Sequence, residues 1–380
     1  MTRIVWRIAR RSLSLASVRY RALLPALALQ AHGFESRFAD SDTGLSLDHA
    51  DLLVISKSFS HLDIDLCRQA RSRKIAVTLD LCDNIFVPGY GQGLPHRPAD
   101  VFRSMAGHAQ LVTCPTEALA EVIRDELGRN IPVAVVPDSV ETPELVRQQA
   151  RLLVECPAIG KPDLPMRRRL LRTLRSVRSK FSQWQRKSGD QGSSPEAIRS
   201  ALGEAAVIVW FGNHGSTHGS AGLTDILLFR SALEQLASEQ SVRLLVVSNG
   251  RSRFDQLIAP LSIPAVYQEW SPEALDQALS IADVAIIPNS QDVFSIGKSA
   301  NRTVLCLQAG LPVVATPTRA LDPLAGAIWT DDPLQGLKQY LSDPVRVKTD
   351  LLKAGELIQT HFSLDAVGLQ WQQLYRSVLR

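Results

Sequence analysis

Residues 297–317, GKSANRTVLCLQAGLPVVATP, decide the fold class of this chain. A polar loop leads into a short helical pattern that ends at Gly310, since glycine suits the left-handed position after a helix. Pro312 turns the chain, and Val313-Val314-Ala315 then predicts a strand buried on both faces of a parallel sheet. The loop before the helix therefore lies at the carboxyl edge of such a sheet, where ligands bind and helix N-termini receive anions.

The same alternation of strand-like and helix-like segments extends outward in both directions. We predict strands at 3–6, 51–56, 75–80, 110–114 and 133–137 in the first part of the chain, and at 207–211, 243–248, 265–268, 283–288 and 312–315 in the second. Strands that alternate with helices form βαβ units and a parallel sheet. At 380 residues the chain is long enough for two such domains, each with its own core.

One segment resembles the donor-binding region of the large retaining family of GT-B glycosyltransferases. These proteins often have the pattern E-x7-E followed by A-x-G-x-P-V-V-A, and the second half stands here as QAGLPVVA at 308–315. The two glutamates fall on Gly297 and Leu305, so the resemblance is to a divergent branch with K-S-x-N-R in that place.

The resemblance implies an α/β fold of two doubly wound, Rossmann-like domains facing a cleft. It places an acceptor-side domain at 1–145, a basic helical insert at 146–205, a nucleotide-sugar domain at 206–362, and a C-terminal helix at 363–380 that crosses back to the first domain.

Transfer from a nucleotide sugar chiefly requires stabilisation of the charge that develops on the leaving diphosphate. Relatives place an Arg and a Lys after the first strand of the second domain, but the region here, WFGNHGSTHGSAG at 210–222, has neither. Its glycines let backbone N–H groups approach a phosphate, so we predict donor binding by Gly212, Asn213, His214, Gly215 and Ser299.

Lys298 and Arg302 are then the cations available for catalysis, with Asn301 as a partner for a diphosphate oxygen or a sugar hydroxyl. Four residues apart, the two cations would share one helical face. The alternative is that they only solvate or cap the loop. The donor is a substrate, so no resident cofactor is predicted.

On the acceptor side, Arg19 and Arg21 begin a predicted helix after the first strand and could bind an anionic acceptor. Asp80 and Asp83 end a strand and could orient acceptor hydroxyls. The alternatives are two solvated arginines and a plain turn at Asp83.

The insert carries nine Lys and Arg residues between Arg167 and Lys187, and Asp163 and Asp190 are the nearest acidic residues on either side. Leu170, Leu174, Val177, Phe181 and Trp184 would form an apolar stripe on a helix. Either this helix packs on its own protein, or 167–187 lies on an anionic membrane surface. Nucleic-acid binding is disfavoured because no accompanying motif is present.

Composition and cysteine spacing limit the class of protein further. The net charge is +4, and no apolar run approaches the ~18 residues that span a bilayer. With no apolar signal core near the N-terminus, a cytoplasmic protein is expected, peripheral at the membrane's inner face if 167–187 binds lipid. The five cysteines are widely spaced and show no ligand pattern with the eight histidines, so no metal site is predicted.

The leading hypothesis is a retaining nucleotide-sugar glycosyltransferase that acts on a glycan or lipid-linked acceptor in cell-envelope polysaccharide synthesis. Because both glutamates and the Arg/Lys pair are missing, the alternative is a catalytically inactive GT-B module that binds a glycan or a partner protein. A sugar-nucleotide epimerase of the same fold is weaker, since no acid/base cluster stands out.

Overall fold

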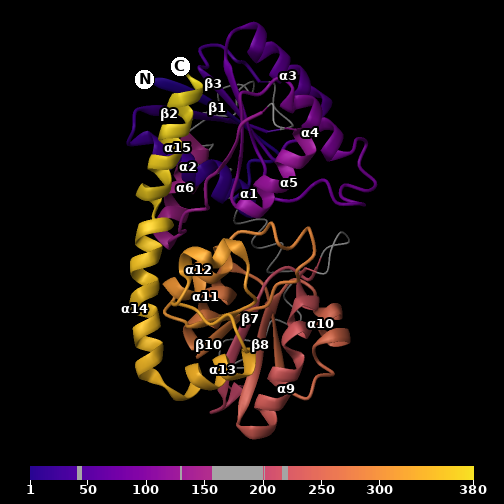
Figure 1. Cartoon of the computed structure of the whole chain (residues 1–380), viewed down its shortest axis with the longest axis vertical. Helices are drawn as coiled ribbons and strands as arrows, with labels where there is room; N and C mark the ends of the chain where they lie inside the picture. The colour runs from indigo at the N-terminus through magenta and orange to yellow at the C-terminus, as the bar shows by residue number, and fades with distance from the viewer. Residues whose placement is uncertain (41–44, 129–130, 156–199, 201, 216–220) are drawn as a thin grey trace. The chain divides into compact units, whose positions relative to one another are not determined.

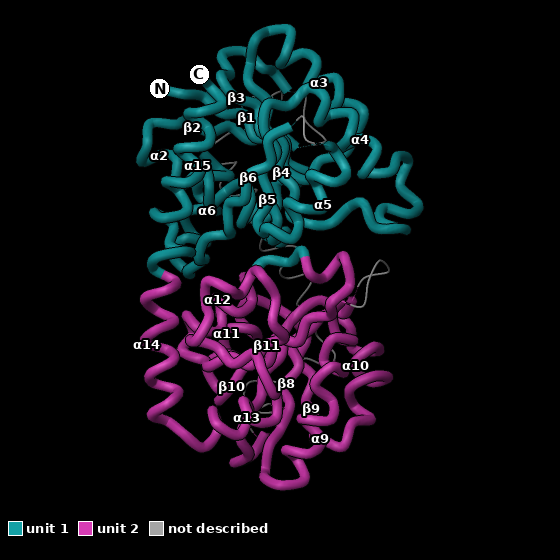
Figure 2. Tube along the Cα trace, in the orientation of Figure 1, with its two compact units in different colours: residues 1–174, 297–299, 359–380 teal, residues 175–296, 300–358 magenta. Residues whose placement is uncertain are grey.

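The computed structural model describes the chain except for residues 41–44, 129–130, 156–199, 201 and 216–220. The described residues form two compact units (Figures 1 and 2), one made of those within Met1–Leu174, Gly297–Ser299 and Gln359–Arg380, the other of those within Arg175–Ile296 and Ala300–Ile358. We call them unit 1 and unit 2. The basic stretch 167–187 lies outside the described residues.

Unit 1 contains a parallel sheet in the order β2-β1-β3-β4-β5-β6. Its strands are β1 (Thr2–Ile8), β2 (Phe34–Ala39), β3 (Leu52–Ser56), β4 (Ala76–Asp80), β5 (Leu111–Cys114) and β6 (Val133–Val135). Its helices are α1 (Ala16–Val18), the π-helical turn η1 (Arg19–Leu23), α2 (Leu24–Gln30), α3 (His61–Ser72), α4 (Pro98–Ala106), α5 (Glu117–Leu127), α6 (Pro143–Glu155) and α15 (Leu364–Val378).

Unit 2 contains a second parallel sheet in the order β11-β10-β7-β8-β9. Its strands are β7 (Ala206–Phe211), β8 (Val242–Ser248), β9 (Ala265–Glu269), β10 (Val284–Ile287) and β11 (Val313–Ala315). Around them lie η2 (Leu223–Phe229), α9 (Arg230–Glu239), α10 (Arg251–Leu257), α11 (Pro272–Ile281), α12 (Asn301–Gln308), η3 (Arg319–Leu324) and α13 (Pro333–Ser342). Helix α14 (Pro344–His361) begins in unit 2 and ends in unit 1.

Each sheet is covered by apolar side chains, as parallel sheets require. In unit 1 one cluster packs α3, α4 and α5 against the sheet, and the other packs η1, α2 and α15 against its opposite face. The C-terminal helix contributes Trp371 and Tyr375, both fully buried, to the second cluster beside Trp6. The last helix is therefore part of the core of the unit that holds the N-terminus.

The predicted α/β fold class is confirmed, and each predicted strand occurs within a residue or two of its expected position. Strand β2 was not predicted, because its sequence FESRFA is half polar. The prediction that Lys298 and Arg302 share a helical face is wrong, since α12 begins at Asn301 and Lys298 precedes it. The structure also groups Gly297–Ser299 with unit 1, whereas the sequence placed these residues in the second domain.

Candidate functional site

The strand order of unit 2 defines where a ligand would bind. Strand β7 is followed along the chain by β8 and β9 on one side, and by β10 and β11 on the other. The order therefore reverses between β7 and β10, and ligands of doubly wound sheets bind beyond the carboxyl ends of strands at such a point. The loop after β7 begins at Gly212, and we call residues 212–215 the glycine loop.

The backbone donors of the glycine loop are largely occupied by the protein itself. The Gly212 N–H donates to the Val247 carbonyl at 3.1 Å, which extends the β7–β8 ladder. The His214 N–H donates to Asn249 Oδ1 at 3.0 Å, and the Gly215 N–H donates to Asn213 Oδ1 at 3.3 Å. The interpretation that these three N–H groups are available to a phosphate is wrong, because each already has an acceptor.

The glycines instead allow close approach of side chains. A Cβ at Gly212 would lie 3.0 Å from the Trp210 ring and 3.3 Å from Arg302 Nη1. A Cβ at Gly215, whose φ is +138°, would lie 2.8 Å from Arg253 Nη1. The loop is thus flanked by two arginines, and glycine at these positions makes room for them.

Arg302 reaches the glycine loop from the first turn of α12. Its Nη1 donates to the Phe211 carbonyl at 3.3 Å, and its guanidinium lies 6.0 Å from the centroid of the Trp210 ring. Among the described residues, no carboxylate lies within 4.0 Å of it. Burial lowers the pKa of Arg302, while Asp225 raises it, so the guanidinium is a desolvated cation without a direct counter-ion. Asn301 is the first residue of the same helix.

Asp225 lies in the first turn of η2. One carboxylate oxygen accepts from the Gly222 N–H at 3.1 Å. The other oxygen is buried and has no hydrogen-bond partner among the described residues. Burial raises the pKa of Asp225, and the Gly222 N–H and Arg302 oppose the shift. Asp225 therefore holds the start of η2 and is the carboxylate whose charge acts on Arg302.

Lys298 was predicted to contact the donor and Asp83 the acceptor, but the two side chains lie together in unit 1. The Asp83 carboxylate accepts from the ammonium groups of both Lys298 and Lys57. Burial would raise the pKa of Asp83, but the two lysines outweigh it and hold the pKa well below its ordinary range. Lys57 directly follows β3 and has a left-handed backbone with φ of +49°, which is uncommon outside glycine. Ser299 belongs to the same segment of unit 1 as Lys298.

We expect Asp83→Asn to destabilise unit 1 by about 1–3 kcal/mol at neutral pH, because two ammonium groups lose their anion. A carboxylate whose folded pKa is depressed stabilises above its unfolded pKa of about 4, and that stability is lost as pH falls towards the folded value. The difference in unfolding free energy between wild type and variant should therefore be constant from pH 8 to 5 and shrink below about pH 4. Denaturant titrations across this range measure it, and a difference that disappears near pH 6 would contradict the assignment.

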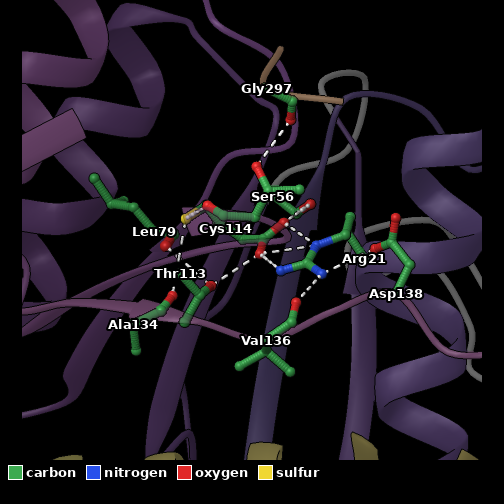
Figure 3. Close-up of polar contacts among 11 residues, drawn as sticks. Arg21, Ser56, Leu79, Thr113, Cys114, Ala134, Val136, Asp138 and Gly297 are labelled. Carbon is green, nitrogen blue, oxygen red and sulfur yellow. Dashed lines mark hydrogen bonds and ion pairs between the residues drawn. The ribbon is translucent and has the colours of Figure 1, made fainter. Parts of the chain in front are cut away.

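Arg21 and Asp80 are buried in unit 1. Arg21 Nη2 and Asp80 Oδ1 are 2.7 Å apart, and Arg21 Nη1 donates to Asp138 Oδ1 at 2.9 Å and to the Val136 carbonyl at 2.7 Å (Figure 3). Side-chain exposure is 1% for Arg21 and 0% for Asp80. The guanidinium also lies 5.1 Å from the centroid of the Trp371 ring. The prediction that Arg21 and Asp80 bind the acceptor is wrong, because every face of the pair is covered by protein.

Arg19 is likewise engaged, though closer to the surface. Its Nε lies 2.9 Å from Glu141 Oε1, and its Nη1 donates to the Leu13 carbonyl at 2.6 Å. The side chain is 18% exposed, so the alternative of a solvated arginine does not describe it either. Of the four predicted acceptor contacts, Arg19 and Asp83 keep some exposure, 18% and 14% of their side chains, whereas Arg21 and Asp80 are buried.

Sequence reasoning missed two cations at the carboxyl edges of the sheets, Arg253 and Lys57. Both follow a strand closely, Lys57 after β3 and Arg253 in the helix after β8. The available signal was their position, since parallel strands of one sheet end at one edge and the segments after neighbouring strands meet there. A search confined to the loop after β7 and the start of α12 could not find Arg253.

Metal and thiol chemistry find no support in the described residues. They contain no group of three or more His, Cys, Asp or Glu arranged for a metal ion. Burial raises the pKa of the thiols of Cys67, Cys82, Cys114 and Cys306 to about 12, so they stay protonated at neutral pH. No helix in the described part of the chain combines the length and apolarity needed to cross a bilayer.

Comparison with known proteins gives a match by structure alone. No protein-family model and no curated protein matches the sequence. The Escherichia coli trehalose-6-phosphate protein bound with UDP-2-fluoro glucose is similar with a TM-score of 0.59 and 13% identity, over 100% of this chain and 99% of that chain. Sucrose-phosphate synthase from Thermosynechococcus elongatus gives 0.59 and 14%, over 99% of each chain. A trehalose-6-phosphate synthase studied for glycosyltransfer with retention gives 0.57 and 11%, over 100% of this chain and 99% of that chain.

These similarities span essentially the full length of both chains, and both parallel sheets fall within them. The chain therefore has the GT-B fold, with two Rossmann-like units, as its resemblance to the retaining glycosyltransferases implied.

Proposed function

We propose that this chain is a glycosyltransferase that takes a sugar from a nucleotide-diphosphate donor bound by unit 2. The observation that carries the proposal is the pair of arginines beside the glycine loop at the switch point of the unit 2 sheet, neither of which has a carboxylate partner among the described residues. Structures of similar fold include a protein that binds a UDP-sugar analogue, which supports the same class of donor.

The residues suit a reaction that needs charge stabilisation more than acid or base chemistry. During transfer, the bond between the anomeric carbon and the diphosphate oxygen breaks and its electron pair stays on that oxygen. The anomeric carbon bonds to the acceptor oxygen, and the released diphosphate takes up the acceptor's proton. A preorganised cation such as Arg302 stabilises the charge that develops on the leaving oxygen. Retention of configuration is the outcome we expect, in keeping with the retaining neighbour.

The acceptor is proposed at the level of its class. The neighbours are synthases of trehalose phosphate and sucrose phosphate, which makes sugar phosphates the first acceptors to test. Glycans and lipid-linked acceptors of the cell envelope, and contact of 167–187 with an anionic membrane, remain predictions from the sequence. In unit 1, the partly exposed ion cluster of Asp83, Lys57 and Lys298 is the group of charges that we propose an acceptor of any of these kinds would contact.

The test measures release of nucleoside diphosphate from each of a panel of nucleotide sugars. Each donor is assayed alone and then with sugar phosphates, oligosaccharides or lipid-linked sugars as acceptors. We expect one donor to be turned over, and turnover to rise with its cognate acceptor. If every donor is bound but none is consumed with any acceptor, the absent glutamates at Gly297 and Leu305 mark an inactive GT-B module. If no donor is bound, the proposal is wrong.

A further inference from the structure

A cavity of about 420 Å³ adjoins the glycine loop in unit 2. It is lined by His214, Gly250, Ser252, Arg253, Gln256 and Leu257. The first of these belongs to the loop after β7, and the others to the segment after β8, including α10 (Figure 1). The cavity is therefore at the carboxyl edge of two neighbouring strands, where a doubly wound sheet receives its ligand.

Arg253 is the cation of this cavity, and no carboxylate among the described residues lies within salt-bridge distance of it. Within this described part of the chain, its hydrogen bond is from Nη2 to the Thr224 hydroxyl at 3.0 Å. The neighbouring Arg251 differs in this respect, because its Nε lies 2.8 Å from Asp255 Oδ1. The two arginines of this short helix thus differ: Arg251 is paired with a carboxylate, whereas Arg253 lines the cavity.

The surroundings of Arg253 are arranged to hold its guanidinium against the loop. Gly215 has φ of +138°, and a Cβ there would lie 2.8 Å from Arg253 Nη1 and 3.0 Å from its Cζ. Gly250 makes room for His214, since a Cβ at Gly250 would lie only 2.1 Å from His214 Cβ. Both glycines leave room for a polar side chain that lines the cavity.

His214 is oriented by the same network. Its Nδ1 lies 3.0 Å from Asn249 Oδ1, an acceptor, so Nδ1 carries the proton and Nε2 is left for another partner. With the backbone N–H groups of Gly212, His214 and Gly215 already donating inside the protein, the charge that the cavity offers a ligand comes from Arg253. Ser252 and Gln256 add neutral hydrogen-bonding groups.

We propose that Arg253 binds the diphosphate of the donor in this cavity and supplies the cation that the loop after β7 lacks. This inference rests on the proposed function for the identity of the anion. Arg253 and Arg302 then approach the diphosphate from the two ends of the glycine loop, Arg253 beside Gly215 and Arg302 beside Gly212. A planar guanidinium can donate two parallel hydrogen bonds to phosphate oxygens, which an ammonium group cannot.

The experiment compares Arg253→Ala with Arg251→Ala as the matched control from the same helix, and with Arg253→Lys. Calorimetry with inorganic pyrophosphate measures the anion site alone, and calorimetry with nucleoside diphosphates measures the whole donor site. We expect Arg253→Ala to weaken both by about tenfold or more, Arg253→Lys to recover part of the loss, and Arg251→Ala to match wild type.

A second variant covers the case in which Arg253→Ala loosens the loop. Ser252→Glu places a carboxylate in the cavity from an exposed position, and we expect it to weaken pyrophosphate binding while the thermal midpoint stays at the wild-type value. Wild-type pyrophosphate affinity in folded Arg253→Ala and Ser252→Glu would overturn the assignment. Pyrophosphate binding that depends on Arg253 in a protein that turns over no nucleotide sugar would instead refute the proposed function and leave the anion site standing.

Discussion

Arg21→Ala is expected to destabilise unit 1 by about 3–5 kcal/mol, because it leaves the buried carboxylates of Asp80 and Asp138 without their cation. Arg21 contacts the Val136 carbonyl and the carboxylate of Asp138 as well as Asp80 (Figure 3). Asp80 ends β4 and also accepts from Ser56 Oγ of β3 at 3.2 Å and from Thr113 Oγ1 of β5 at 2.8 Å. The cation that pairs with Asp80 is Arg21, which belongs to the π-helical turn η1. The Asp80 side chain therefore links β3, β4 and β5 to that turn.

Hydrogen exchange in each unit measures this effect separately, which matters because a two-domain protein need not unfold in one step. We expect faster exchange in β3, β4 and β5 of the variant and unchanged exchange in β7 to β11. Arg37→Ala is the control, since Arg37 is 47% exposed and its 3.6 Å pair with Glu35 lies on the surface, where such pairs contribute about 0–1 kcal/mol. An Arg21 variant as stable as the Arg37 variant would refute a structural role for the buried cluster.

Arg302→Ala is expected to lower turnover of the donor by about 10²–10³-fold, the usual cost of removing one preorganised donor to a developing anion. Binding of the intact nucleotide sugar in the absence of acceptor should weaken by only about tenfold, because the charge on the leaving oxygen is larger in the transition state than in the bound donor. Arg302→Lys should recover part of the rate, since it keeps the charge but loses the planar fork. The rate of diphosphate release at saturating donor gives the first number, and calorimetry gives the second.

The control for Arg302 is Arg230→Ala, an exposed arginine of unit 2 paired with Glu234 at 3.2 Å. It should leave both rate and affinity unchanged. Weaker donor binding with an unchanged rate at saturating donor in Arg302→Ala would mean that the guanidinium binds donor and transition state equally and has no special role in the transition state. Lys298→Ala is informative beside it, because Lys298 belongs to the ion cluster of unit 1 and should affect donor binding less than Arg302.

The fold was predictable because its signals are local and repeated. Apolar runs such as LLVIS and VVA, each bounded by a turn, indicate buried parallel strands without reference to the rest of the chain. Strand β2 was not predicted because Glu35 and Arg37 interrupt its apolar residues. Its register beside β1 depends on contacts that no local pattern encodes. The resemblance at 308–315 supplied the order of domains.

The site was harder to predict, because its charges are set by distant partners. Nothing near Arg21 in the sequence indicates that it pairs with Asp80 and Asp138, which lie far along the chain. The glycine loop was correctly located, but its N–H groups are occupied by Val247, Asn249 and Asn213, of which two lie far along the chain. Arg253 could be found only once β7 and β8 were known to be neighbours.

The central claim is that unit 2 binds a nucleotide-diphosphate donor between Arg253 and Arg302. Calorimetric titration of the wild-type chain with uridine, guanosine, adenosine, cytidine and thymidine diphosphates tests it most directly. The account predicts that one of them binds at one site per chain, more tightly than its monophosphate, and that Arg302→Ala and Arg253→Ala each weaken it. Absence of binding by all five, or binding that neither arginine affects, would contradict it.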